Sequence, residues 1–297
     1  MTALNHRLQA LLEKGQGAAI RALDRLPGFV QEGLAKGLGY PYIYPELDPL
    51  IKCIMAAQLK QGKTGFIGAD LNRARKAFDL QMQALKAKPT PVRQVEDLRL
   101  PLQSGTVFAR HYHPAPNKKL PMIVFFHGGG FVLGNLDTHD EACRLLALHA
   151  KAQVLSIDYP LAPEQPFPAA FDALYQAYHA LLNQGVAADH IILAGDCAGA
   201  NLALSLNLRL LRENAPQPCG LVLMSPLLDL TLSSESLRFN QQHDALLSLT
   251  LIENAIQHYI APHTDRDDPR VSPLFDQLQG LPKTLVQVGS KALLLDD

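Results

Sequence analysis

The sequence contains no tryptophan, no marked excess of charge and no long hydrophobic run. Its 27 basic and 28 acidic side chains leave a net charge of −1, and no basic cluster of the kind that binds nucleic acid occurs. No apolar run approaches the roughly 20 residues that a membrane-spanning helix needs. The N-terminal stretch MTALNHRLQALLEKG has scattered charges and does not resemble a secretory signal. We expect a globular, cytoplasmic protein without a nucleic-acid partner or a membrane span.

Cysteine is scarce, and its spacing argues against two further classes of protein. Only four cysteines occur, widely separated, with no CxxC pair and no grouping with histidine, at Cys53, Cys143, Cys197 and Cys219. This pattern predicts neither a disulfide framework nor a metal site. We expect four reduced thiols and no metal.

The chain divides into two regimes of hydrophobic patterning. Residues 1–90 place apolar side chains at helical spacing. After the Pro-rich break KPTPV (Lys88–Val92), short apolar runs such as MIVFF, QVLSIDY, HIILAG, GLVLMS and KTLVQVG alternate with helical stretches. One helix is expected to open on a Thr138-x-x-Glu141 capping box. The pattern predicts a mostly parallel sheet of about seven strands with helices on both faces.

Two glycine-rich corners follow buried strands, where such sheets bind ligands. The first, FFHGGGFVLG, has three successive glycines that allow a sharp turn with outward N–H groups. The second, Gly195-Asp196-Cys197-Ala198-Gly199, has the small flanking residues of a strained strand-to-helix turn that exposes its central side chain. An oxyanion hole needs N–H donors from the first corner and from the residue after the nucleophile. Here those donors are Gly129, Gly130 and Ala198.

Three motifs in this order, HGGGFVLG, DYPLAPEQPFPAA and GDCAGANLAL, resemble the hormone-sensitive-lipase family of bacterial α/β-hydrolase esterases over roughly residues 90–290. The resemblance implies an α/β-hydrolase fold with residues 1–90 as an N-terminal helical cap over an acyl pocket and residues 91–297 as the catalytic core. It implies hydrolysis of a small-molecule ester with a short to medium acyl chain, without a metal or an organic cofactor. It assigns the nucleophile position to Cys197, the oxyanion hole to Gly128, Gly129, Gly130 and Ala198, and motif support to His127, Gly195, Asp196 and Gly199.

The sequence departs from the family pattern at three places. Cys197 stands where the family has serine, and Lys291, or in another register Ala292, stands where it has the acidic member of the triad. The last strand and helix of the family, with the triad histidine between them, are expected beyond Asp297 and are missing here. Of the eleven histidines, we consider His243 and His263 able to approach the site, although both are expected at the surface.

A thiol depends less on a base than a hydroxyl does, because a few per cent of it is thiolate at neutral pH. We expect the N-terminus of the following helix to lower the pKa of Cys197, so that it is alkylated before the other cysteines. Acylation is then feasible, whereas hydrolysis of the acyl-enzyme needs an activated water. Two alternatives to an impaired esterase stay open: a non-catalytic binder of apolar ligands, and a cysteine hydrolase of the dienelactone-hydrolase type.

The apolar run Lys283–Gly289 is expected to form an unprotected edge of the sheet. Such an edge is a template for pairing with another chain. We therefore expect aggregation or a homodimer through this edge.

Overall fold

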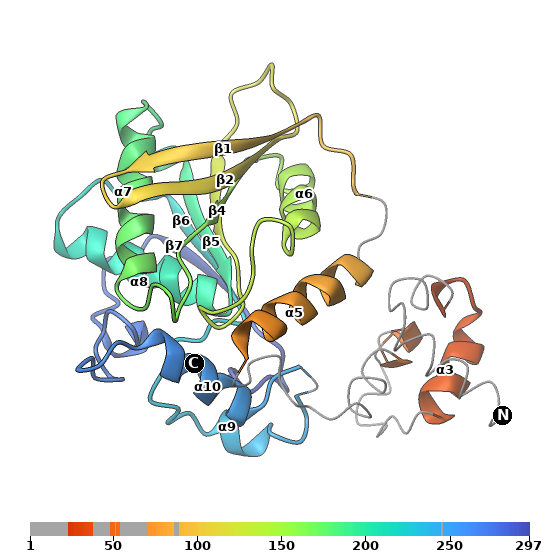
Figure 1. Cartoon of the computed structure of the whole chain (residues 1–297). Helices are drawn as coiled ribbons and strands as arrows, with labels where there is room; N and C mark the ends of the chain where they lie inside the picture. The colour runs from red at the N-terminus through yellow and green to blue at the C-terminus, as the bar shows by residue number, and fades with distance from the viewer. Residues whose placement is uncertain (1–22, 38–47, 51, 54–69, 86–88, 245) are drawn as a thin grey trace.

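The computed structural model describes residues 23–37, 48–50, 52–53, 70–85, 89–244 and 246–297, and its centre is one seven-stranded sheet (Figure 1). The strand order is β1-β2-β4-β3-β5-β6-β7, with β2 antiparallel to both β1 and β4 and all other neighbours parallel. The strands are β1 Gln94–Leu102, β2 Gly105–His113, β3 Met122–Phe126, β4 Gln153–Asp158, β5 Ile191–Asp196, β6 Gly220–Met224 and β7 Lys283–Gln287. The expectation of a mostly parallel sheet of about seven strands is confirmed.

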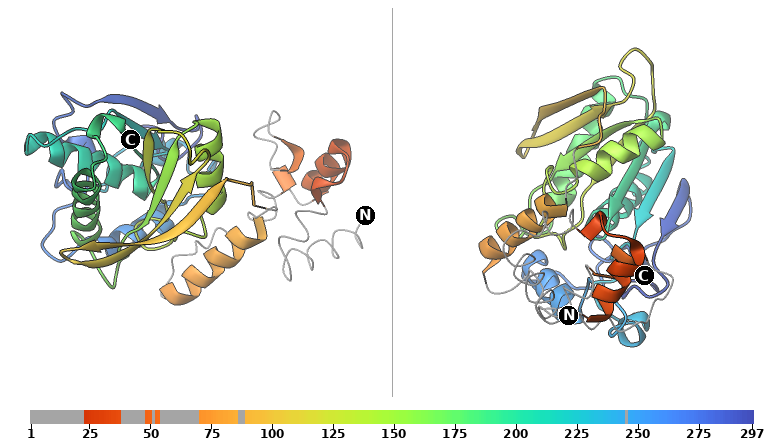
Figure 2. Two further views of the ribbon diagram at one scale, coloured as in Figure 1. Left: turned by 90° about the horizontal axis from the view of Figure 1, so that it is seen from above. Right: turned by 90° about the vertical axis from the view of Figure 1, so that its right-hand side faces the viewer.

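Helices cover both faces of the sheet, because alternate side chains of its central strands are buried on opposite sides. Ile123 and Phe125 of β3 pack with α6 (Asp140–His149), whereas Val124 and Phe126 pack in the main core with α7 (Ala169–Asn183) and α8 (Ala198–Arg212). Figures 1 and 2 show α6 on one side of the sheet and α7 and α8 on the other. The remaining short elements near the C-terminal half are η1 Ala188–His190, α9 Ser236–Phe239, α10 Leu249–Tyr259 and η2 Pro273–Phe275.

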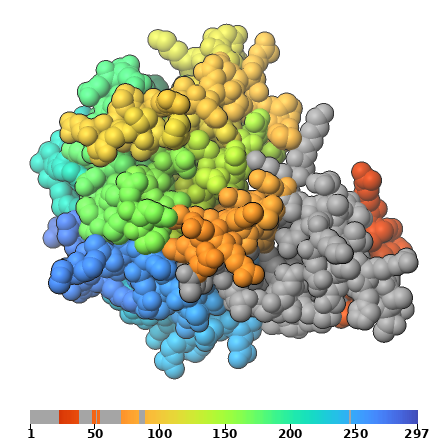
Figure 3. Space-filling view, viewed as in Figure 1, coloured from red at the N-terminus to blue at the C-terminus, as the bar shows by residue number. Residues whose placement is uncertain are grey.

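The N-terminal region contributes two described helices with different packing. Helix α3 (Gly28–Gly37) belongs to a small apolar cluster with Leu23 and Cys53. Helix α5 (Leu71–Leu85) instead packs on the main core through Ala74. In Figure 3 its orange atoms lie against green atoms of the central segments and blue atoms of the C-terminal ones. Within the described residues, no helix is both long enough and apolar enough to cross a bilayer.

The Arg75 side chain fastens α5 to the loops that follow β3 and β4. Its Nε donates to the Val132 carbonyl at 2.8 Å, and one Nη donates to the Ala162 carbonyl at 2.8 Å. Both Nη atoms also meet the Glu164 carboxylate at 2.7 Å. Because these loops leave the carboxyl ends of the strands, α5 lies at the end of the sheet where parallel sheets carry their ligand sites.

Two local expectations fared differently. The predicted capping box is wrong: α6 has His139 at its N-cap without a side-chain capping bond, and the Glu141 carboxylate accepts hydrogen bonds from the N–H and hydroxyl of Thr90. The edge strand is confirmed as β7, with every residue exposed and with Leu285 and Val286 exposed by 59% and 55%.

Candidate active site

Cys197 occupies the single residue between β5 and α8, in a strained backbone conformation. Its φ of +51° and ψ of −113° lie in a region that residues with a side chain rarely adopt. Three backbone hydrogen bonds hold it there. Its N–H donates to the Met224 carbonyl, and its carbonyl accepts from the N–H groups of Asn201 and Leu227. This geometry turns the Cys197 side chain away from the bonded backbone, as at a nucleophile elbow.

The flanking glycines make the sharp turn possible. A Cβ on Gly199 would lie 2.0 Å from the Phe126 carbonyl oxygen, and a Cβ on Gly195 would lie 2.4 Å from the Gly199 carbonyl carbon. Both distances are shorter than any real contact of a Cβ with backbone. The strand β3, the elbow and the start of α8 therefore approach one another too closely for any larger residue.

Three backbone N–H groups lie beside the Cys197 thiol. They belong to Ala198 at the start of α8 and to Gly129 and Gly130 of the loop after β3, and each acts to lower the pKa of the thiol. The loop reaches this position through positive φ angles of 120° at Gly129 and 60° at Gly130. Donors in this arrangement stabilise negative charge beside the elbow, which is the requirement of an oxyanion hole.

Gly128, which the family resemblance also assigns to the oxyanion hole, has a different partner. Its N–H donates to Oδ1 of Asp196 at 2.9 Å. Because an N–H has one hydrogen, Gly128 ties the loop to the end of β5 and does not add a donor to the hole. This assignment is corrected accordingly.

The pKa of the Cys197 thiol is raised, not lowered. Burial, the larger cause, and the nearby Asp196 carboxylate together raise it to about 12, against the opposite effect of the Ala198, Gly130 and Gly129 N–H groups. The expectation of a depressed pKa is therefore wrong, because the loss of water around the sulfur outweighs the helix N-terminus. Thiolate at this site forms only in small amounts near neutral pH.

His127 lies behind the glycine loop in an environment that keeps it neutral. It is fully buried, its Nδ1 is 2.8 Å from the Gly128 carbonyl oxygen, and its ring stacks on Tyr159 with centroids 4.3 Å apart. Tyr159 in turn donates its hydroxyl hydrogen to the His127 carbonyl at 2.6 Å. Burial lowers the pKa of His127 to about 4. These contacts hold the glycine loop in shape. Because the ring is neutral near pH 7, it has no acidic proton to donate in a reaction.

The positions expected for the triad acid hold no carboxylate. Lys291 is exposed in the turn after β7, and the Ala292 carbonyl accepts a hydrogen bond from Asn240. The Asp297 carboxylate binds the N–H groups of Leu228 and the following residue. It therefore anchors the loop after β6.

The two histidines considered able to approach the site were expected at the surface. His263 is exposed with a φ of +74°, and His243 lies half-buried after α9. Within the described ranges, no hydrogen bond links either ring to the Cys197 sulfur. The same part of the chain holds no group of His, Cys, Asp or Glu side chains arranged for a metal ion.

Sequence reasoning missed one residue of this site. Nε2 of His139, which follows the glycine loop, lies 3.5 Å from Oδ2 of Asp196. The two residues are far apart in the chain, so no local pattern signals the contact.

Comparisons with known proteins identify the fold family of this chain. Residues 123–297 match the family described as alpha/beta hydrolase fold. An esterase of Acinetobacter venetianus is 57% identical over 176 residues, which cover 59% of this chain and 58% of the relative. The carboxylic ester hydrolase LipN of Mycobacterium tuberculosis is 35% identical over 84% of this chain and 69% of its own length.

Solved structures of esterases are also similar. An esterase of Pyrobaculum calidifontis superposes with a TM-score of 0.71 at 33% identity, over 77% of each chain. An esterase described as belonging to the bacterial hormone-sensitive lipase family superposes with a TM-score of 0.72 at 29% identity, over 82% of this chain and 79% of that one.

Proposed function

This chain belongs to the alpha/beta hydrolase fold family, and from that premise we propose that it acts on carboxylic esters with short to medium acyl chains. The single observation that carries the proposal is the strained elbow at Cys197, with the Ala198, Gly129 and Gly130 N–H groups beside its thiol. The names of the relatives, esterase and carboxylic ester hydrolase, support the same reaction class. The motifs HGGG and GDCAG and the likeness to a hormone-sensitive lipase family esterase favour that family as the closer grouping.

The first chemical step is transfer of the acyl group to sulfur. The Cys197 thiol loses its proton to solvent, and its Sγ attacks the ester carbonyl carbon. The carbonyl oxygen takes the negative charge, which the N–H groups of Ala198, Gly129 and Gly130 stabilise. The bond to the alcohol oxygen then breaks, which leaves a thioester on Cys197. A phenolate departs as the anion, and an alkoxide takes up a proton from solvent to become the alcohol.

The second step, attack of water on the thioester, sets the turnover rate. A general base normally activates this water, and no histidine is among the groups that act on the Cys197 thiol in the described part of the chain. An oxyanion hole and substrate binding alone still leave roughly 10³–10⁴-fold catalysis over water. We therefore expect rapid acylation relative to hydrolysis, with activated esters as the best substrates.

Residues 1–90 act as the cap of this proposed site. Helix α5 supports this role because Arg75 binds the Val132 carbonyl in the segment that continues the glycine loop. The exposed edge of β7 supports a second proposal, a homodimer joined through that edge.

The test is acylation by p-nitrophenyl acetate in a Cys219→Ala background, which removes the exposed thiol. We expect a stoichiometric burst of p-nitrophenol, followed by slow turnover. Mass spectrometry should place one acetyl group on the peptide that contains Cys197. Cys197→Ala should abolish the burst, and Cys197→Ser should weaken it because a hydroxyl needs a base more than a thiol does.

Two results would overturn the proposal. One is a burst that survives Cys197→Ala. The other is saturable binding of an ester without acetylation of Cys197, which would establish the alternative of a non-catalytic binder of apolar ligands. Sustained turnover that Cys197→Ala abolishes would keep the proposal and show that a base acts at the site.

A further inference from the structure

The Asp196 carboxylate links the glycine loop to the N-cap of α6. Its Oδ1 accepts the Gly128 N–H at 2.9 Å, and its Oδ2 lies 3.5 Å from Nε2 of His139. The side chain is 34% exposed, so water competes for its oxygens. A second protein partner on Oδ2 fixes the carboxylate in the orientation that receives Gly128.

The His139 ring is held on several sides, so it can act as that partner. Its Nδ1 is 2.8 Å from the Thr138 hydroxyl, and its ring stacks on His127 with centroids 5.5 Å apart and packs at a tilt on Phe125. The ring is 12% exposed. A constrained ring directs Nε2 toward Asp196 without further loss of conformational freedom.

The Thr138 hydroxyl fixes the Nδ1 side of the His139 ring. It donates its hydrogen to the Asn135 carbonyl at 2.8 Å, and its oxygen lies 2.8 Å from Nδ1. With that hydrogen on Asn135, Nδ1 donates to the Thr138 oxygen, and Nε2 faces Oδ2 of Asp196 as an ion-pair partner. The Asn135 N–H still donates to the Thr138 oxygen at 2.9 Å.

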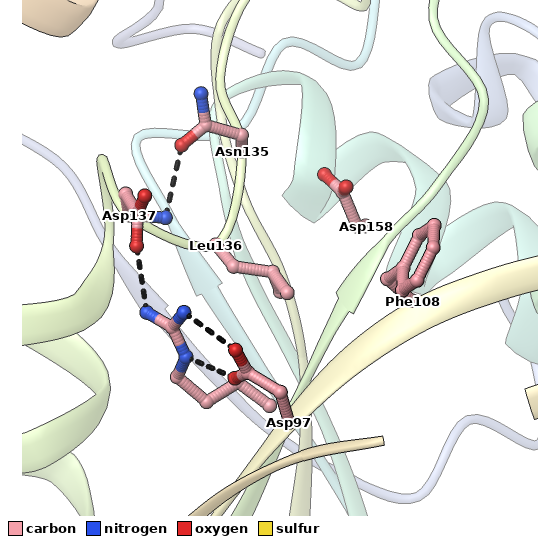
Figure 4. A pocket seen from close by; sticks show the side chains of 7 residues that line it. Asp97, Phe108, Asn135, Leu136, Asp137 and Asp158 are labelled. Carbon is pink, nitrogen blue, oxygen red and sulfur yellow. Dashed lines mark hydrogen bonds and ion pairs between the residues drawn. The ribbon is translucent and has the colours of Figure 1, made fainter. Parts of the chain in front are cut away.

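The backbone at His139 is anchored by the next residue. The buried Asp140 carboxylate accepts from the Tyr112 hydroxyl at 2.9 Å and from Nε of Arg144 at 2.9 Å. Arg110 lies 3.4 Å from the same carboxylate and pairs with Asp137 at 2.8 Å in a cavity of about 230 Å³ (Figure 4). These contacts fix the start of α6 against the sheet.

We propose that His139 is a positioning residue, which orients Asp196 so that the glycine loop presents its Gly129 and Gly130 N–H groups to the reacting atoms. The inference rests on the proposed esterase function for its kinetic consequence, and its structural part stands on the Gly128–Asp196–His139 contacts. Loss of the His139 donor leaves Asp196 free to turn to solvent. Gly128 then loses its acceptor, and the two donors that follow it shift.

The test compares three variants in the Cys219→Ala background. His139→Phe keeps a ring against His127 and removes the donor, His139→Gln keeps a donor near the Nε2 position, and His149→Phe removes an exposed histidine from the same helix as the control. The acylation burst gives the rate constant for acyl transfer and, separately, the p-nitrophenyl acetate concentration that half-saturates it.

Misplaced oxyanion donors slow chemistry without weakening binding. We expect His139→Phe to lower the acylation rate constant by about 10-fold to 10²-fold. The half-saturating concentration should stay unchanged, His139→Gln should restore most of the rate, and His149→Phe should match the parent. Equal acylation rate constants in His139→Phe and the parent would refute the positioning role. A higher half-saturating concentration with an unchanged rate constant would also refute it.

A second readout does not require activity. In protein labelled with ¹⁵N-glycine, the Gly128 amide should show the low-field proton shift and slow solvent exchange of an N–H bonded to a carboxylate. Both properties should be lost in His139→Phe and kept in His139→Gln. If the parent shows no burst, the proposed function fails, and the Gly128 amide still decides the His139 inference. If His139→Phe does not fold, Thr138→Val, which removes the partner of Nδ1, should show the same changes to a smaller degree.

Discussion

Arg75→Met tests whether α5 is held to the core chiefly by one guanidinium. Arg75 makes two hydrogen bonds to carbonyls of the buried residues Val132 and Ala162, and an exposed pair with Glu164. Hydrogen bonds from a charged donor contribute about 1.5–3 kcal/mol each, and exposed ion pairs about 0–1 kcal/mol. Taking the lower end for a partly exposed side chain, we expect a loss of about 3–4 kcal/mol in the free energy of unfolding.

Urea unfolding followed by circular dichroism measures this loss, since the chain has no tryptophan to report by fluorescence. Arg73→Met, two residues earlier on an exposed side of α5, is the matched control and should cost little. A cost for Arg75→Met within about 1 kcal/mol of that for Arg73→Met would refute the reasoning, because exposed substitutions stay in that range.

The ion pair between Arg75 and Glu164 should make the free energy of unfolding depend on pH. Its hydrogen bond with Arg75 lowers the pKa of Glu164 from 4.5 to about 2. A depressed carboxyl pKa stabilises the fold above the unfolded value, and the contribution is lost as pH falls from about 4.5 to about 2. Because Glu164 is 58% exposed, screening reduces the effect to about 0.5–1 kcal/mol. Glu164→Gln should lack this component of acid destabilisation, and identical acid profiles would contradict it.

Three further predictions follow from packing and exposure. Gly199→Ala should lower the free energy of unfolding in urea by about 3 kcal/mol or more, because its Cβ meets the Phe126 carbonyl. Gly33→Ala, where the added carbon meets open space, should cost nothing. Equal costs for the two variants would contradict the close approach. Iodoacetamide should alkylate the exposed Cys219 before Cys197, as peptide mapping would show, and the opposite order would mean that burial does not control the Cys197 thiol. Leu285→Lys on β7 should lower self-association measured by light scattering, and a parent that stays monomeric at high concentration would refute the edge dimer.

The sequence located the sheet and the elbow because both depend on local patterns. Short apolar runs mark buried parallel strands, and the glycines around Cys197 mark a backbone approach that only glycine permits. The apparent capping box failed for the opposite reason. Thr138 and Glu141 have the right spacing, but Glu141 binds Thr90, which lies 51 residues earlier in the chain. A competing partner of that kind cannot be read from a short window.

The pKa of Cys197 and the role of His139 depend on tertiary packing in the same way. The helix N-terminus was visible in the sequence, whereas the burial that outweighs it arises from tertiary packing around the half-buried side chain. The contact between His139 and Asp196 forms because β3 and β5 are adjacent in the sheet and end at the same level. Strand order and register, which the sequence does not state, decide which side chains meet there.

The tight approach of Gly195 and Gly199 to their neighbours has a consequence for how this family can diversify. The backbone around residue 197 admits no added carbon, whereas the side chain of residue 197 points away from that contact and differs from the expected serine by one atom. The central residue of the turn can therefore vary, whereas its flanking glycines cannot be replaced without a clash with the backbone. A search for distant members should therefore weight the glycine spacing and the preceding strand above the identity of the central residue. Such a search would recover scaffolds that have exchanged one nucleophile for another.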